Sequence, residues 1–109
     1  MVAPRDGEPV VVRRCPNSFV QTDLDVRLKA LGVKQLVLAG FMTHMCINST
    51  AHGAFNLGYG VAGVGNATAT RALQGPQGKV LSAREAHDGA LASTRDLYAA
   101  VVDRASEVA

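Results

Sequence analysis

The sequence predicts an α/β fold, a three-layer, doubly wound (Rossmann-like) architecture in which helices cover both faces of a parallel sheet. Two observations predict it. Short apolar runs alternate along the chain with stretches whose apolar residues recur at helical spacing. Polar residues do not interrupt the apolar runs. Strands and helices in alternation favour right-handed crossovers and parallel sheets buried on both faces. At 109 residues and 48% hydrophobic, the chain has room for one core, so a single domain is expected over residues 1–109.

The first strand is expected at residues 10–12, with a helix after it. Three consecutive valines follow a turn rich in proline and glycine, which predicts a short buried strand. Thr22 is a suitable N-cap for a helix whose three leucines share one face. Gly32 stands where a helix ends with a left-handed residue.

The middle of the chain carries the strongest patterns. Residues 36–40 are apolar without alternation, as expected of a strand covered by helices on both faces. Residues 43–57 have apolar positions at helical spacing, and Gly58 ends the segment. Residues 61–64 predict a third strand, short and rich in glycine.

The last element is a long amphipathic helix. Ser82 and Glu85 form a capping-box pair ahead of a helical pattern that continues through Val102. Residues 73–79, rich in glycine and glutamine, are expected to form a surface loop.

Charge and composition exclude several classes of function. The formal net charge is +2 and the basic residues form no run or stripe, so we expect no nucleic-acid partner. No stretch reaches the roughly 18 apolar residues needed to span a bilayer, and the N-terminus lacks a secretory signal, so we expect a cytoplasmic protein with no membrane partner. Cys15 and Cys46 are expected to be free thiols. We expect no cofactor, and no metal, because no His, Asp or Glu pair has metal-ligand spacing.

Cys46 is the strongest candidate for a reactive residue. It lies where the strand at residues 36–40 passes into the next helix. The positive end of the helix dipole favours the thiolate, which is the nucleophilic form, and the unpaired amides there can hold an oxyanion. The alternative is a small core residue on the first turn, the commoner role of a lone cysteine.

Residues 36–73, LVLAGFMTHMCINSTAHGAFNLGYGVAGVGNATATRAL, resemble the isochorismatase-like cysteine hydrolase family. The resemblance continues back through GEPVVVRRCPNSFVQTDLDVRLKALGV and so covers nearly the whole chain. It implies a doubly wound α/β fold and a catalytic triad of Asp, Lys and Cys. It further implies that a small-molecule substrate is cleaved at an amide-type C–N bond through a covalent acyl-cysteine.

The resemblance also implies roles for individual residues. Cys46 matches the family nucleophile, and Arg13 stands at the position of the triad lysine. The peptide bond between Phe41 and Met42 matches a cis bond of the family, and the amides of Met42 and Cys46 would form the oxyanion hole. Candidate pocket residues are Phe19, Phe41 and His44. A core role is the alternative for the two phenylalanines, and a solvent-facing position is the alternative for His44.

The chain departs from the family pattern at two positions of the catalytic triad. Arginine keeps the charge of the triad lysine but does not readily lose a proton, so we expect impaired catalysis. The triad aspartate would close a first strand upstream of the GEPVV segment, and no acidic residue of this chain ends an apolar strand. We therefore expect a domain truncated at its N-terminus. Its open apolar strand edge would be covered by a second copy, giving a homo-oligomer, or by a complementing chain.

Two other functions remain open from the sequence. The chain is alternatively a non-catalytic, truncated remnant that serves as an interaction module or as part of a split or domain-swapped oligomer. A nucleotide-binding module of flavodoxin-like topology rests on fold analogy alone. His87 shows no partner pattern in the sequence.

Overall fold

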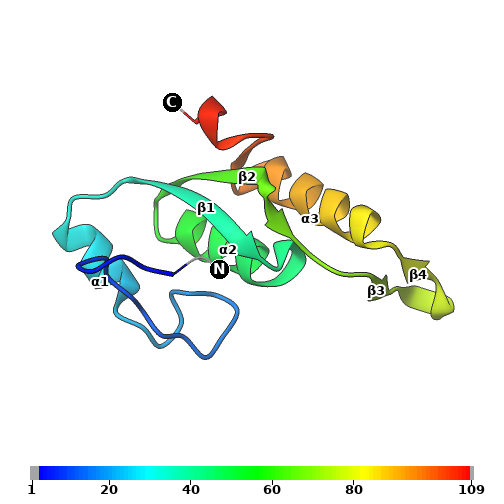
Figure 1. Cartoon of the computed structure of the whole chain (residues 1–109), viewed down its shortest axis with the longest axis horizontal. Coiled ribbons are helices and arrows are strands. Elements are labelled where there is room, and N and C mark those ends of the chain that lie inside the picture. The colour runs from blue at the N-terminus through cyan, green and yellow to red at the C-terminus, as the bar shows by residue number, and fades with distance from the viewer. Residues whose placement is uncertain (1–2, 109) are drawn as a thin grey trace.

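The computed structural model describes residues 3–108, and Figure 1 shows their arrangement. The predicted α/β class is confirmed, since three parallel strands form one sheet in the order β1-β2-β5 with helices packed against it. The strands of this sheet are β1 (Gln35–Phe41), β2 (Gly60–Ala69) and β5 (Ala100–Val102). The α-helices are α1 (Leu24–Ala30), α2 (Asn48–Asn56) and α3 (Ala83–Leu97). A small antiparallel sheet pairs β3 (Leu73–Gln74) with β4 (Val80–Leu81).

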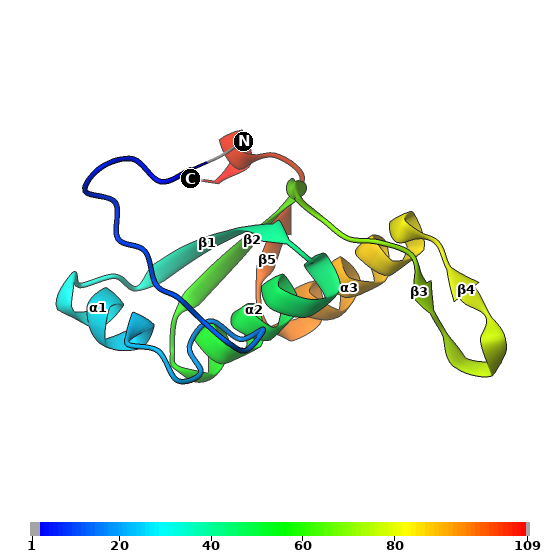
Figure 2. The ribbon, with the colours of Figure 1, turned by 60° about the horizontal axis from the view of Figure 1, so that its bottom comes forward.

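Helices α2 and α3 lie on the same side of the three-stranded sheet (Figure 2). Burial alternates along β1, so that Leu36 and Leu38 pack against the core while Val37 is 54% exposed. The expectation that residues 36–40 would be covered on both faces was wrong for the part of the chain that is described. An uninterrupted apolar run does not by itself report how many faces of a strand are covered.

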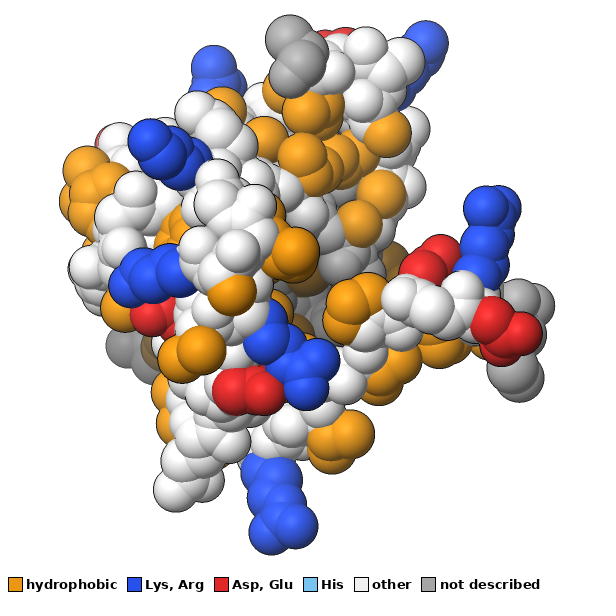
Figure 3. Space-filling view, turned by 90° about the vertical axis from the view of Figure 1, so that its left-hand side faces the viewer, with side chains coloured by type: hydrophobic (Ala, Val, Ile, Leu, Met, Phe, Trp, Pro, Cys, Tyr) orange, Lys and Arg blue, Asp and Glu red, His pale blue; other side chains and the backbone are white. Residues whose placement is uncertain are grey.

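Residues 10–12 form no strand, which corrects the first expected element. Val12 is 81% exposed, and this segment has no regular secondary structure and no strand partner among residues 3–108. β-branched residues favour strands through packing against neighbouring strands, and the propensity alone does not form one. Figure 3 shows the end of the molecule that carries α1, where exposed hydrophobic side chains lie among lysine and arginine side chains.

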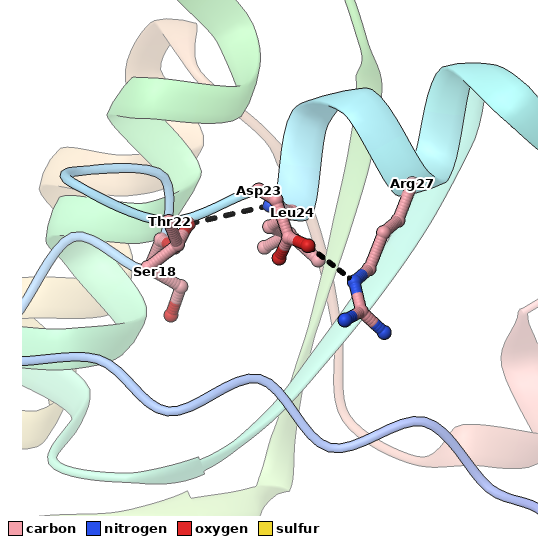
Figure 4. A network of polar contacts seen from close by, with 5 residues as sticks. All are labelled: Ser18, Thr22, Asp23, Leu24 and Arg27. Atoms are coloured by element: carbon pink, nitrogen blue, oxygen red, sulfur yellow. Dashed lines mark hydrogen bonds and ion pairs between the residues drawn. The ribbon is translucent and has the colours of Figure 1, made fainter.

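The N-cap of helix α1 lies one residue later than predicted. Asp23 occupies the N-cap position, and Thr22 accepts a hydrogen bond at Oγ1 from the Leu24 amide at 3.4 Å. Arg27 then pairs with Asp23 over one turn at 2.8 Å (Figure 4). Gly32 has φ +71° beyond the last turn, as the sequence predicts for a left-handed C-terminal residue.

The helix expected over residues 43–57 is confirmed, with a π-helical turn at Thr43–Ile47 leading directly into α2. Gly58 then adopts φ +92°, which favours glycine. The strand expected at residues 61–64 is confirmed and is longer than predicted, since β2 extends to Ala69 and pairs with both β1 and β5.

The C-terminal region differs from the sequence prediction at two places. The capping box of Ser82 and Glu85 is present, but α3 ends at Leu97, and Val101 and Val102 belong to β5. Their β-branched side chains suit the parallel pairing with β2 that the chain makes available there. Residues 73–79 are not a plain loop either, because they supply β3 and the turn of a hairpin that projects from the sheet (Figure 2).

The core lies between α2 and the sheet. Phe19, Leu28, Leu36, Leu38 and Ala99 pack around a buried cluster of Ala51, Ala54, Tyr59 and Val61. Small alanines on α2 allow the helix to approach the strands closely. This packing fixes α2, and therefore the turn in front of it, relative to the carboxyl end of β1. Over residues 3–108, no helix combines the length and apolar character that a bilayer crossing requires.

Candidate active site around Cys46

The candidate site lies at the carboxyl end of β1, where parallel sheets carry their ligands. Gly40 has φ +122°, a backbone conformation that favours glycine. Space is not the constraint, because a Cβ built on Gly40 would lie 3.9 Å from the Ile47 side chain, an ordinary contact distance. The peptide bond joining Phe41 to Met42 is cis. The chain then enters the π-helical turn that carries Cys46.

The π-helical turn is organised around the Met42 carbonyl. This oxygen accepts hydrogen bonds from the amides of Met45 at 3.1 Å and Ile47 at 3.2 Å. The amide of Cys46 lies between these two donors in the chain. Thr43 and Ile47 are buried and anchor the turn, whereas Cys46 is only partly buried. Cys46 is therefore held on an anchored turn and keeps partial exposure to solvent.

Arg13 contacts the sulfur of Cys46 although 33 residues separate them in the chain. Its Nη2 donates a hydrogen bond to Sγ at 2.9 Å, and its Nη1 donates to the Cys15 carbonyl at 2.9 Å. A guanidinium stays charged at all relevant pH values, so this contact places a fixed positive charge beside the sulfur. The structure thus brings together the two residues that the sequence singled out as catalytic candidates.

The loop that carries Arg13 is attached to α2 by Thr50. The hydroxyl of this buried threonine accepts from the Ser18 amide at 3.1 Å and donates to the Pro16 carbonyl at 3.3 Å. Its Oγ1 also lies 3.2 Å from the hydroxyl oxygen of Ser18. These contacts fix residues 16–18 on the helix that follows Cys46. Thr50 was not predicted from the sequence, where its only signal is that it is a polar residue on the apolar side of an amphipathic helix.

Two further side-chain contacts hold the turn in front of Cys46. Thr43 Oγ1 and His87 Nδ1 form a hydrogen bond of 2.8 Å, and His44 Nδ1 and Thr70 Oγ1 form one of 2.6 Å. His87 comes from α3 and Thr70 follows the end of β2. Neither partner could be predicted from the sequence, because no local pattern relates residues so far apart.

The aromatic residues proposed for a pocket lie in two different environments. Phe19 stacks on Tyr59 with ring centroids 5.8 Å apart and packs against the core, in line with the alternative considered for it. Phe41 is 73% exposed at the end of β1. Three crevices of 360–400 Å³ in the described part of the chain have neither phenylalanine, nor His44 or Cys46, in their linings.

Acidic side chains take no part in the site as far as residues 3–108 show. The carboxylates in ion pairs are those of Asp23, Asp25 and Asp88, each bonded to a base four residues along a helix. Neither Arg13 nor Cys46 bonds to a carboxylate within the described residues. Three or more His, Cys, Asp or Glu side chains grouped to hold a metal ion are likewise absent from these residues.

Comparisons with known proteins give a consistent result. The sequence model of the isochorismatase domain matches residues 1–106. The uncharacterized isochorismatase family protein YddQ of Bacillus subtilis is 41% identical over 100 residues, which cover 92% of this chain and 55% of YddQ. The ureidoacrylate amidohydrolase RutB of Variovorax paradoxus is 38% identical over 56 residues, covering 51% of this chain and 22% of RutB.

The solved structure of an isochorismatase from Pseudomonas putida superposes on this fold with a TM-score of 0.90 and 36% sequence identity. The superposition covers 95% of this chain and 53% of that one. This chain thus spans about half the length of YddQ and of the P. putida protein.

Proposed function

This chain belongs to the isochorismatase family, and on that premise we propose that it acts as a cysteine hydrolase of amide-type C–N bonds with Cys46 as the nucleophile. The observation that carries the proposal is the 2.9 Å hydrogen bond from Arg13 Nη2 to Cys46 Sγ. A fixed positive charge in contact with a partly exposed sulfur is the environment expected of a reactive cysteine. The similarity to RutB, an amidohydrolase, favours an amide-type substrate.

The proposed reaction proceeds in two steps. The Cys46 sulfur attacks the substrate carbonyl carbon, and the electron pair of the C=O bond moves onto its oxygen. The amides of Met42 and Cys46 donate hydrogen bonds to that oxygen. The intermediate collapses as the C–N bond breaks and the nitrogen leaves with a proton. Water then attacks the acyl-cysteine, releasing a carboxylic acid and restoring the thiol.

Arg13 stabilises charge in this scheme but transfers no proton. Its guanidinium does not deprotonate readily, and within residues 3–108 no carboxylate bonds to the pair. The proton lost by the thiol therefore passes to solvent, and solvent returns a proton to the leaving nitrogen. General acid–base catalysis typically contributes about 10²–10⁴-fold, so turnover by this chain alone is expected to be slow.

A second candidate function is that of an interaction module that pairs with a second copy or a complementing chain. The observation that favours it is the position of β1 at the end of the strand order, with Val37 54% exposed and Phe41 73% exposed. Among the described residues, β1 pairs on one side alone, with β2. Open strand edges with apolar side chains are sites of strand pairing between chains.

The proposed nucleophile is tested by alkylation with iodoacetamide at neutral pH. Peptide mass spectrometry follows the labelling of Cys46 and Cys15 in the same sample, so that Cys15 serves as an internal control. We expect Cys46 to react faster than Cys15. Equal rates, or faster labelling of Cys15, contradict the proposal. In a second measurement, incubation with a panel of small carboxamides is expected to leave an acyl adduct on Cys46 and none on a Cys46→Ser variant.

A further inference from the structure

We infer that the hydrogen bond between Thr43 and His87 is a positioning contact that sets the reactivity of Cys46. The inference rests on the proposed function, in which Cys46 is the nucleophile. Thr43 lies three residues before Cys46 and directly after Met42. Its hydroxyl is in contact with His87 Nδ1 at 2.8 Å, across 44 residues of sequence.

The contact is partly buried, with Thr43 on its enclosed side. Thr43 is 1% exposed, and His87 is partly buried on the second turn of α3. A buried hydroxyl that loses its partner remains unsatisfied and destabilises the conformation that buries it. The backbone at Thr43 is therefore held where His87 places it.

A second tether acts on the next residue. His44 Nδ1 and Thr70 Oγ1 are 2.6 Å apart, and Thr70 lies just beyond the carboxyl end of β2. Two consecutive residues are thus bonded to two different elements, one to α3 and one to the segment after β2. Together the two bonds restrain the turn in two directions, which a single contact would not do.

The turn needs such restraint because its backbone is unusual. The Ile47 amide bonds to the Met42 carbonyl five residues earlier at 3.2 Å, which is the π-helical pattern. Single π-helical turns are rare and are less favourable than continuous α-helix. If the tether at Thr43 is lost, the turn can relax toward α-helical geometry. Cys46 Sγ would then move relative to Arg13 Nη2, and the amides of Met42 and Cys46 would move with it.

The test compares Thr43 with a threonine that is equally buried but remote from the turn. Thr94 on α3 is 4% exposed, and its hydroxyl donates to the Ala90 carbonyl at 2.8 Å. Thr43→Val and Thr94→Val each remove one buried hydroxyl at nearly constant volume. Thr43→Ser keeps the hydroxyl and is the rescue variant. At position 87, His87→Asn keeps a polar group near Nδ1, and His87→Ala removes it.

The measurements on the full chain are the iodoacetamide rate at Cys46 and the melting temperature. We expect Thr43→Val and His87→Ala to slow alkylation of Cys46 by roughly threefold to tenfold, the effect of one lost hydrogen bond. Thr43→Ser and His87→Asn should retain most of the wild-type rate. Thr94→Val should lower the melting temperature and leave the alkylation rate unchanged. An unchanged rate in Thr43→Val, or an equal loss in Thr94→Val, overturns the inference.

If the proposed function is wrong, the alkylation experiment gives a different result. In that case wild-type Cys46 reacts no faster than Cys15, whatever the variants do. The positioning role is then read from the amide ¹H–¹⁵N NMR shifts of Met42 and Cys46, which report backbone geometry without requiring a reactive thiol. Shifts that move in Thr43→Val and return in Thr43→Ser support the contact, and shifts that stay at their wild-type values in Thr43→Val refute it.

Discussion

The side chain of Asn17 fills the space directly above Gly53 on α2. A Cβ placed on Gly53 would lie 2.5 Å from Asn17 Nδ2 and 2.7 Å from Oδ1. The asparagine is not free to move aside, because its Oδ1 accepts a hydrogen bond from the Phe19 amide at 3.0 Å. The loop that carries Arg13 therefore crosses α2 at a point where only glycine fits.

Replacing Gly53 with alanine is expected to destabilise the protein and to displace this loop. The overpacking cost is about 1–3 kcal/mol, which outweighs the gain of up to about 1 kcal/mol from replacing glycine inside a helix. The melting temperature and the alkylation rate of Cys46 should both fall. Gly89→Ala on α3 is the matched control, since a Cβ there meets no atom within 4 Å. It should raise the melting temperature, and a rise in Gly53→Ala as well would refute the crowding argument.

Removal of the Arg13 side chain is expected to slow alkylation of Cys46 while Cys15 is unaffected. The guanidinium donates a hydrogen bond to the sulfur at 2.9 Å, so the loss of this contact should reduce the rate by roughly threefold to tenfold. The measurement is the labelling rate of each cysteine in Arg13→Ala. Arg14→Ala removes the same charge one residue later and should have little effect. Equal slowing in both variants would mean that net charge alone sets the rate.

Stability in acid is expected to depend on the pair of Tyr59 and Asp25. The Tyr59 hydroxyl donates to Asp25 Oδ1 at 2.6 Å, and this bond, followed by that from Lys29, lowers the pKa of Asp25 from its ordinary value of 3.8. The contribution of Asp25 to stability is therefore present above pH 3.8 and is lost as pH falls through the lowered pKa. Thermal unfolding between pH 2 and 6 should show this loss in the wild type and a smaller one in Tyr59→Phe. Parallel pH profiles would contradict the prediction.

The same contact raises the pKa of Tyr59 to about 12, chiefly through the hydrogen bond to Asp25. Because the folded value exceeds the ordinary value of 10.0, the stabilisation is complete below pH 10 and is lost as pH rises toward and through 12. Ultraviolet titration of phenolate absorbance should show one tyrosine ionising near pH 12, and Asp25→Asn should lower that midpoint. A midpoint near 10 in both proteins would be inconsistent with the contact.

A lysine at position 37 is expected to weaken any association through β1. Val37 lies on the exposed face of this strand, and a charge there opposes strand pairing with another chain. Sedimentation velocity over a range of protein concentrations should show less association in Val37→Lys than in wild type. Val80→Lys, on the projecting β4 where Val80 is 66% exposed, is the control and should behave as wild type. A wild type that is monomeric at every concentration would exclude the homo-oligomer.

The elements that the sequence predicted well are those with local signals. Ser82 and Glu85 lie within one turn of each other, and Gly32 and Gly58 end their segments through their own backbone preference, so each is visible in a short window. The run at residues 36–40 was identified as a strand because it is apolar and is not interrupted by polar residues. The position of Cys46 at a strand-to-helix junction was also visible locally, and its role as a nucleophile, which stays a prediction, was inferred from the family resemblance.

The errors came from interactions between distant residues. Residues 10–12 have strand-forming side chains but no adjacent strand in the described structure. Val101 fits the helical pattern of the preceding residues, but in the structure it pairs with Gly63 and belongs to a strand. The contacts of Thr43 with His87 and of Thr50 with Ser18 join elements more than 30 residues apart. Such contacts depend on the packed fold, so no window of the sequence contains them.

Arg13 reaches the sulfur from a segment that is neither strand nor helix, attached to the scaffold mainly through Thr50. Rearrangement of that segment would separate charge from thiol while every regular element kept its shape. Circular dichroism would then register no change even if the reactivity proposed for Cys46 were lost, so folding and thiol reactivity have to be assayed separately.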